Sequence, residues 1–359
     1  MILSAVQTFL FVFLGNWILE IKSLTFNYWL VLFTTSAFAN LVGLNVSSAL
    51  NNVVNIYILI PFIIVPELLF GGVLVSFNKL HKDFASADCV PIVGDVMTSR
   101  WAYEALALTQ FEDNQYSKYF YKVEREISQA NYDATFLVPR LKTLNENTMR
   151  ALKTGENIDK VDRDLKVIKN MIEEICKVRG LQFEKINSLT KDGFNDTVSD
   201  ELDSFLDDLK AKAEKEQYIA GERKDEIYAE LIHTLGSRSA VQQLQMENQN
   251  KRLDEMLLNK NEVEKILMTS DFRLVQQKDP AYHITRFTNG RSHFYSPIKK
   301  LGSWEIPTFT FNLVFIWLTT TFFYFALRFT WLKKVLDKIS GFKISLKHKK
   351  DKKQETVQK

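Results

Sequence analysis

The chain has 359 residues, of which 46% are hydrophobic and 25% are charged, and its formal net charge is +3. This small excess of positive charge excludes a protein whose main partner is nucleic acid. The charge is unevenly distributed, because the first 78 residues carry only three charged side chains, Glu20, Lys22 and Glu67. Together with a second apolar block near the C-terminus, this distribution predicts a membrane protein with a large polar insert.

The first apolar block is long enough for three membrane helices. A bilayer core of about 30 Å takes about 20 helical residues, and the predicted spans are Ile2–Ile21, Tyr28–Leu50 and Val53–Val75. Only Asn51 and Asn52 separate the second span from the third, so these two form a tight helical hairpin. No basic segment precedes the first span and no clear small-residue cleavage site follows it, which argues against a cleaved signal peptide.

The third predicted span contains residues that lipid disfavours, namely Pro61, Pro66, Glu67 and the pair Gly71 and Gly72. Proline inside a helix costs about 3 kcal/mol and frees a backbone carbonyl, and a carboxylate at membrane depth costs about 2.5–3.5 kcal/mol on insertion scales. Such features are tolerated where the backbone is buried in protein or lines a cavity. The segment indicates a cavity-lining helix that ends early. The alternative is a kinked packing helix in which Glu67 is protonated or bonded to a neighbour.

The stretch "VPIVGDVMTSRWAYEALALTQF" follows the third span. Its Arg100 and Glu104 are four residues apart and therefore share one helix face. Aromatic residues beside arginine favour a membrane interface. We therefore expect a short re-entrant helix that dips into the outer leaflet, with a motif formed by Ser99, Arg100, Trp101 and Glu104.

The polar insert is predicted to be mostly helical. Apolar residues recur at helical spacing in one segment, at Val161, Leu165, Ile168, Ile172 and Ile175. Residues 198–217 and 240–268 are further long helix candidates, and "TKDGFND" and "KDPAYHI" are predicted breaks. The expected structure is a helical hairpin or a small coiled-coil-like bundle, with its charges on a solvated face.

The last apolar block, Phe309–Trp331, is the fourth predicted span. The tail after it has ten lysines against three acidic residues, and positive charge near a span is retained in the cytoplasm. With four spans both termini are cytoplasmic, and the insert lies outside the plasma membrane. The predicted division is three transmembrane helices in 1–78, re-entrant or interfacial helices in 79–111, the extracytoplasmic insert in 112–305, the last transmembrane helix in 306–332 and a basic tail in 333–359. The fold class is thus an all-α polytopic membrane helix bundle.

Motifs that carry chemistry are scarce in this sequence. It has no G-x-x-x-x-G-K-[ST], G-x-S-x-G, H-E-x-x-H or C-x-x-C pattern, so we expect no catalysis and no cofactor or metal in this chain. The five histidines, at positions 81, 233, 283, 293 and 348, show no metal-ligand spacing. Whether Cys89 and Cys176 are bridged stays open, and Asn195 matches a glycosylation pattern.

Several stretches together resemble a known family. "GNWILEI", "PFIIVPELLFGGVLVSFNKL", "SRWAYEAL" and a last span ending in "LKK" are similar to the transmembrane half of G-subfamily, White-like ABC transporters, most closely a bacterial branch with an enlarged outer loop. The resemblance covers about the first 110 residues and the last 50. It implies that the four spans are the third to sixth of six, so that the chain is a fragment or one piece of a split transporter.

The resemblance also implies sites and partners. The chain would be a permease that works with a homodimer mate and with a nucleotide-binding domain that binds ATP and magnesium, and it would export a small-molecule or lipid-like substrate through the membrane. A competing hypothesis is a membrane-anchored sensor or adhesion protein with a helical outer domain. In the family pattern the outer gate would be Val73 and Leu74, after Gly72, and the cavity lining would be Pro61, Val65, Leu68 and Glu67.

Overall fold

The computed structural model describes residues 1–50, 52–75, 77 and 88–338. Asn51 of the predicted hairpin turn, residues 78–87 and most of the basic tail lie outside the described residues. The chain divides into two compact units. Unit 1 comprises Met1–Phe84, Pro91–Leu106 and Phe309–Lys359, and unit 2 comprises Ala85–Val90 and Ala107–Thr308. The roles predicted for 1–78, 79–111, 112–305, 306–332 and 333–359 stay predictions.

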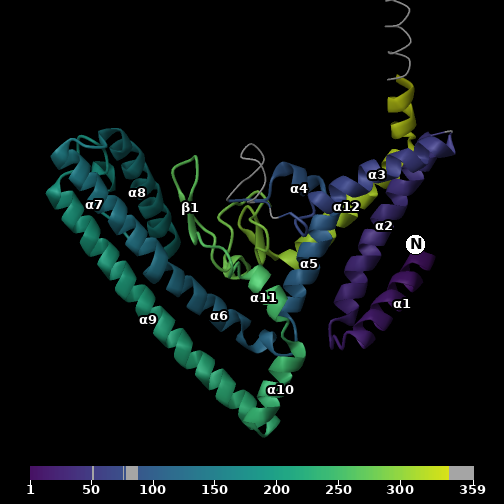
Figure 1. Ribbon diagram of the computed structural model, residues 1–359, viewed down its shortest axis with the longest axis horizontal. Coiled ribbons are helices and arrows are strands. Elements are labelled where there is room, and N and C mark those ends of the chain that lie inside the picture. The colour runs from purple at the N-terminus through teal and green to yellow at the C-terminus, as the bar shows by residue number, and fades with distance from the viewer. Residues whose placement is uncertain (51, 76, 78–87, 339–359) are drawn as a thin grey trace, which may run out of the picture. The chain divides into compact units, whose positions relative to one another are not determined.

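Every segment predicted to span the membrane is helical in unit 1 (Figure 1). The helices of this unit include α1 (Ile2–Ile18), α2 (Thr25–Ala49), α3 (Val53–Leu69), the short α4 (Ile92–Val96), α5 (Thr98–Glu112), which continues into unit 2, and α12 (Thr308–Arg328). Lipid offers no hydrogen bonds to the backbone, so an apolar segment must pair its N–H and C=O groups internally, as a helix does. The all-α membrane fold class is confirmed.

Two of these helices, α2 and α12, are long and apolar enough to cross a membrane. Helices α1 and α3 are shorter, at 17 residues each, which corresponds to about 26 Å of helix. The first was expected to reach Ile21 and the third Val75, so both predicted ends are too late. Helix α1 ends before Glu20, whose backbone is left-handed, and α3 ends before the glycine pair.

The helices of unit 1 are joined by polar side chains as well as by apolar packing. Trp29 on α2 donates from its indole N–H to the carbonyl oxygen of Ala5 on α1, at 3.0 Å. Asn45 on α2 donates to the carbonyl oxygen of Phe323 on α12, at 2.9 Å. Hydrogen bonds of this kind bring transmembrane helices together where lipid supplies no hydrophobic driving force.

Unit 2 is dominated by a helical bundle (Figure 1). Its helices are α6 (Ser117–Tyr132), the π-helical turn η2 (Asp133–Leu137), α7 (Val138–Thr154), α8 (Ile158–Arg179), the 3₁₀ turn η3 (Ile186–Ser188), α9 (Asp196–Leu235), α10 (Arg238–Asn248) and α11 (Lys251–Leu257). Helices α6, η2 and α7 form one continuous rod, and Pro139 near the start of α7 explains the widened turn, because proline lacks the N–H that an α-helical bond needs. Helix α9 lies along this rod (Figure 1).

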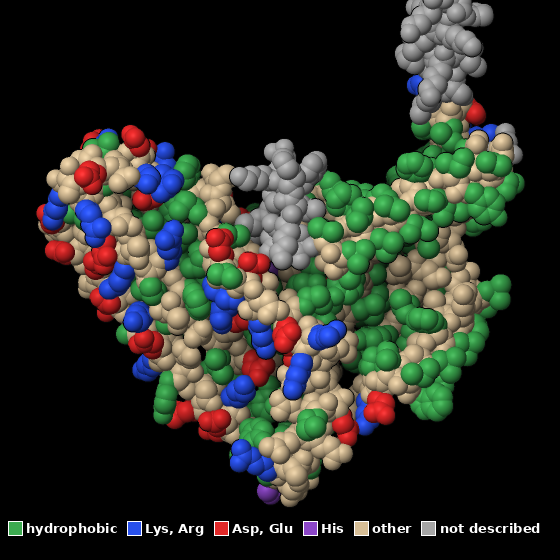
Figure 2. Space-filling model, in the orientation of Figure 1, with side chains coloured by type: hydrophobic (Ala, Val, Ile, Leu, Met, Phe, Trp, Pro, Cys, Tyr) green, Lys and Arg blue, Asp and Glu red, His purple; other side chains and the backbone are tan. Residues whose placement is uncertain are grey.

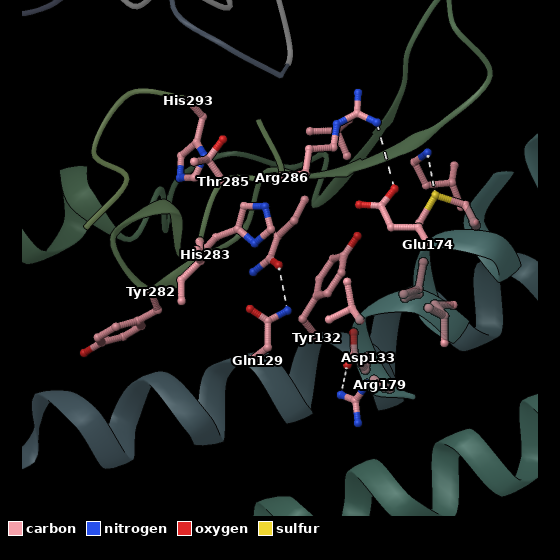
Figure 3. A pocket seen from close by; sticks show the side chains of 18 of the residues that line it. Gln129, Tyr132, Asp133, Glu174, Arg179, Tyr282, His283, Thr285, Arg286 and His293 are labelled. Carbon is pink, nitrogen blue, oxygen red and sulfur yellow. Dashed lines mark hydrogen bonds and ion pairs between the residues drawn. The ribbon is translucent and has the colours of Figure 1, made fainter. Parts of the chain in front are cut away.

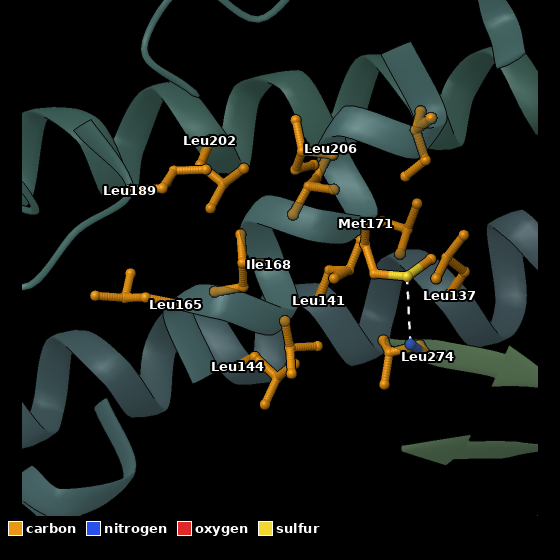
Figure 4. Packing of buried hydrophobic residues seen from close by; sticks show 14 of the residues in the cluster. Leu137, Leu141, Leu144, Leu165, Ile168, Met171, Leu189, Leu202, Leu206 and Leu274 are labelled. Carbon is orange, nitrogen blue, oxygen red and sulfur yellow. Dashed lines mark hydrogen bonds between the residues drawn. The ribbon is translucent and has the colours of Figure 1, made fainter. Parts of the chain in front are cut away.

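Leucine and isoleucine side chains from α7, α8 and α9 fill the core of the bundle (Figure 4). The periodicity expected around α8 is confirmed, because Val161, Leu165, Ile168, Ile172 and Ile175 are all buried. Inside this core Asn145 on α7 and Ser199 on α9 exchange hydrogen bonds through side-chain and backbone atoms, at 3.1 Å each. The pair fixes the register of the two helices.

The prediction of one long helix over 240–268 is wrong. Helix α10 ends at Asn248, and Asn250 then caps α11 by accepting a hydrogen bond from the N–H of Leu253. An asparagine side chain competes with the helical backbone in this way and favours a new helix start. The last three residues of the segment form a strand instead.

Two antiparallel hairpins in unit 2 were not predicted. Strand β1 (Ile266–Met268) pairs with β2 (Leu274–Gln276), and β3 (Ile298–Leu301) pairs with β4 (Trp304–Pro307). The second hairpin turns through Gly302, whose φ is +59°, and Ser303. Gly-Ser between two short apolar runs is a recognised hairpin signal, so the sequence contained it. The predicted break at "KDPAYHI" is confirmed, since a 3₁₀ turn, η4 (Pro280–Tyr282), lies there.

Cys89 and Cys176, the two cysteines of the sequence, are both described and are not bridged to each other. Asn195, of the glycosylation pattern, is exposed and caps α9 by accepting a hydrogen bond from the N–H of Val198, at 3.0 Å. The predicted break at "TKDGFND" therefore ends in a helix cap and is confirmed.

Candidate functional site

The residues singled out by sequence meet at the end of α3, within unit 1. Pro61 and Pro66 lie inside this helix without ending it, and the chain turns at Gly71 and Gly72. Gly72 has a φ of +81°, a left-handed conformation that favours glycine. A Cβ added at Gly71 would lie 2.7 Å from the carbonyl oxygen of Glu67. Both glycines are therefore required by the backbone geometry at this turn.

The carboxylate of Glu67 binds the start of α5. One of its oxygens accepts from the backbone N–H of Thr98 at 3.2 Å, and the other accepts from that of Ser99 at 2.9 Å. The Ser99 hydroxyl donates in return to the carbonyl oxygen of Glu67, at 2.7 Å. The first N–H groups of a helix have no partner within the helix and carry partial positive charge, so an anion there is stabilised. Of the alternatives weighed for Glu67, the structure shows the one in which it is bonded to a neighbour.

Arg100 lies in the first turn of α5 and is only 1% exposed. Its guanidinium pairs with Glu104 at 3.0 Å, and it also pairs with Asp95 of α4. The guanidinium carbon lies 3.4 Å from the centre of the Trp101 ring. The expected Arg100–Glu104 contact on one helix face is thus present, and a buried cation held by two carboxylates and an aromatic ring has its charge fully compensated.

Helix α12 completes this polar cluster through Asn312. The amide of Asn312 donates to Glu104 and to the carbonyl oxygen of Trp101, at 2.9 Å each. Glu104 and Asn312 are both fully buried. The cluster of Asp95, Arg100, Glu104 and Asn312, here named the buried polar cluster, joins α4, α5 and α12.

Sequence reasoning missed Asp95 and Asn312. Asn312 carries the clearer signal, because it is a polar amide inside the otherwise apolar block that forms α12, and polar groups at membrane depth usually face other helices. Trp101 was assigned to a membrane interface, yet it is 4% exposed and stacks on Phe315 of α12, with ring centroids 4.2 Å apart. The re-entrant position of α5 in the bilayer stays a prediction.

The residues assigned to the gate and the cavity wall are exposed, apart from the half-buried Glu67. Val73 is 51% and Leu74 is 66% exposed, and Val65 and Leu68 are about half exposed. None of the side chains of α3 is buried within the described part of the chain. Pro61, Val65 and Leu68 follow one another at spacings of four and three, so they share one face of α3. That face carries no catalytic or metal-binding group, and the described residues contain no metal-ligand cluster.

These features define a polytopic helical membrane protein whose apolar helices surround a small buried polar cluster. Residues 1–111 match the family model described as ABC-2 type transporter. The match identifies this part of the chain as the membrane component of a type-2 ABC permease, which is not a catalytic domain. Searches of curated proteins and of solved structures found no match. The assignment to the G-subfamily and to a bacterial branch stays a prediction.

Proposed function

We propose that this chain is the permease portion of an ABC exporter. A second copy of the chain completes the translocation pathway, and ATP hydrolysis in a separate nucleotide-binding domain, which also holds magnesium, drives transport. Permeases of this family normally work with such an ATPase. The observation that carries the proposal is helix α3, because it lies in the matched segment and leaves its apolar side chains uncovered. A second α3 packed across a two-fold axis would cover them.

In this proposal Val73 and Leu74 form the outer gate. They follow Gly72, whose left-handed backbone lies in the turn after the end of α3. Apolar side chains packed against their symmetry mates exclude water and separate without breaking strong polar contacts. Pro61, Val65 and Leu68 line the cavity below the gate.

The buried polar cluster and the Glu67 cap give the gate a rigid support. Glu67 connects the last turn of α3 to α5, and the cluster connects α5 to α12. In this proposal a movement of α3 reaches the N-terminal part of α12 through these hydrogen bonds and does not depend on apolar packing. We assign Glu67 this supporting role beside its place near the cavity wall.

Cysteine cross-linking tests the dimer and its gate. In a Cys89→Ser, Cys176→Ser background, Leu74→Cys is expected to give a disulfide-linked dimer on oxidation in native membranes. Phe11→Cys, at a lipid-exposed position of α1 that is 70% exposed, serves as the matched control and is expected to stay monomeric. In the transporter with its ATPase, ATP and vanadate are expected to change the yield of the disulfide-linked dimer of the Leu74→Cys variant. Equal yields at the two positions in all states would exclude this gate.

The proposed topology places residues 112–305 outside the plasma membrane and both termini in the cytoplasm. The lysine-rich tail supports this orientation, because positive charge is retained inside. An Asp207→Cys variant in the same cysteine-free background tests it, since Asp207 is exposed on α9. Intact cells should be labelled by an impermeant maleimide; labelling that requires lysis would reverse the topology.

A further inference from the structure

Unit 2 contains a cavity that the transport proposal does not use. Its volume is about 450 Å³, within the range of small-molecule sites and many times the roughly 30 Å³ that one water occupies. Helices α6, α8 and α9, the turn η2, strand β2 and the loop after η4 all contribute to its wall (Figure 3). Segments up to about 200 residues apart in sequence thus line one space. Protein interiors are normally closely packed, so an open space of this size is unusual.

The inner wall of the cavity is apolar. Met171 and Ile175 from α8, Leu209 from α9 and Val275 from β2 lie there, together with the ring of Tyr132. Such a wall favours the apolar body of a ligand, because contact with it removes apolar surface from water.

The charged side chains of the cavity are already paired with protein groups. They number four cationic and four anionic residues, so the site has no net charge. Arg286 pairs with Asp88. Arg179 pairs with Asp133, as Figure 3 shows. Glu126, Glu174 and Lys300 pair with Arg223, Arg273 and Glu305. Arg125 hydrogen-bonds the Tyr121 hydroxyl and interacts electrostatically with Glu112. The site therefore holds no spare charge to compensate an ionised ligand.

One polar atom of the cavity lacks a partner. The Nδ1 atom of His283 is enclosed, and no group of the described residues lies within hydrogen-bonding distance of it. Figure 3 shows the imidazole of His283 between Gln129 and His293; the ring centroids of the two histidines are 5.0 Å apart. Burial lowers the pKa of His283 to about 3, so its ring is neutral and offers one donor and one acceptor. A buried polar atom without a partner calls for an explanation.

We infer that this cavity binds an uncharged amphipathic small molecule, whose apolar body contacts the α8 and β2 wall and whose polar end hydrogen-bonds His283 Nδ1. The size of the cavity, its apolar wall, its paired charges and the open hydrogen-bonding position each support a ligand of this class. The inference concerns unit 2 alone and does not depend on the proposed transport activity.

Calorimetric titration of the full chain in lipid nanodiscs tests the inference, with empty nanodiscs as the blank. The probe is indole-3-carboxamide, which is uncharged and has an aromatic body and a hydrogen-bonding end. We expect one saturable site per chain. Indole-3-carboxylate has the same shape but a negative charge, and we expect at least about tenfold weaker binding, because its charge would be desolvated without a partner. The absence of saturable binding of the amide, or equal binding of amide and carboxylate, would overturn the inference.

Two variants assign the binding to this cavity. Val178→Trp places a bulky ring on the cavity rim and should weaken binding at least about tenfold, whereas Val263→Trp, at an exposed valine that does not line the cavity, should leave it unchanged. His283→Phe keeps an aromatic side chain but removes both ring nitrogens, and should weaken binding about three- to tenfold, the range of one neutral hydrogen bond. Circular dichroism confirms the fold of each variant. Unchanged binding in both cavity variants would place the probe elsewhere and refute the site.

Discussion

Units 1 and 2 are both built from long helices, but they bury and expose opposite kinds of side chain. Unit 1 buries Arg100, Glu104 and Asn312 and leaves apolar side chains exposed, such as Phe11 at 70% and Phe62 at 72%. Unit 2 buries leucine and isoleucine and carries charges of both signs on its surface. On the face shown in Figure 2, hydrophobic side chains cover the helices of unit 1 and charged side chains are spread over unit 2.

The difference shows that the surroundings of each unit decide what stabilises it. In water, burial of apolar surface drives helices together. In lipid that driving force is absent, and packing together with polar contacts between helices must replace it. The buried polar cluster therefore holds the helices of unit 1 together, as the leucine core does in unit 2. Each prediction below alters one side of this comparison.

The largest effect is expected at the buried polar cluster. Arg100→Ala removes the cation shared by Asp95 and Glu104 and leaves a carboxylate that is fully buried. Breaking a buried pair in this way costs about 3–5 kcal/mol. The matched variant in unit 2 is Lys185→Ala, whose exposed pair with Glu201 is worth about 0–1 kcal/mol. Thermal unfolding in nanodiscs measures the stability of both variants. Similar losses of stability in the two variants would contradict the contrast between unit 1 and unit 2.

A smaller effect on the free energy of unfolding is expected when a large apolar side chain is replaced by alanine. Leu202→Ala, at a fully buried position of the unit 2 core (Figure 4), should lower the unfolding free energy by about 2–5 kcal/mol. Phe11→Ala, at an exposed position of α1, should cost much less, because lipid replaces the lost contacts. Denaturant melts followed by circular dichroism report both values. The comparison fails if Phe11→Ala destabilises the chain as strongly as Leu202→Ala.

The smallest effect concerns acidification of unit 2. Burial lowers the pKa of His283 from about 6.5 to about 3, so the unfolded chain binds this proton first as the pH falls. The contribution of His283 to stability is therefore intact above pH 6.5 and declines below it, by at most about 1.4 kcal/mol per pH unit. Glu112 acts in the opposite direction, because burial raises its pKa to about 7, and its contribution is present at low pH and lost as the pH rises through 7.

A histidine variant isolates the contribution of His283. His283→Phe should reduce the loss of stability between pH 6.5 and pH 5.5, measured as the change in Tm, whereas His233→Phe, at an exposed histidine of α9, should leave the pH profile unaltered. A profile that is the same for both variants and the parent chain would show that His283 is charged in the folded protein.

The sequence by itself determined much of the membrane part. The four apolar spans and the Arg100–Glu104 contact follow from local features, because lipid permits few structures and helical spacing fixes which side chains meet. Periodicity likewise determined the buried face of α8. The two hairpins were missed because strands of three or four residues give little periodic signal.

Only the tertiary structure decided which partners these residues have. Nothing near Glu67 in sequence shows that it caps a helix beginning 31 residues later, and nothing near Asn312 shows that it reaches Glu104. His283 and His293 lack metal-ligand spacing, yet their rings stack inside a cavity that no single segment encodes. Hydrogen bonds and cavities depend on distances across the fold, whereas residue patterns report only the environment of one segment at a time.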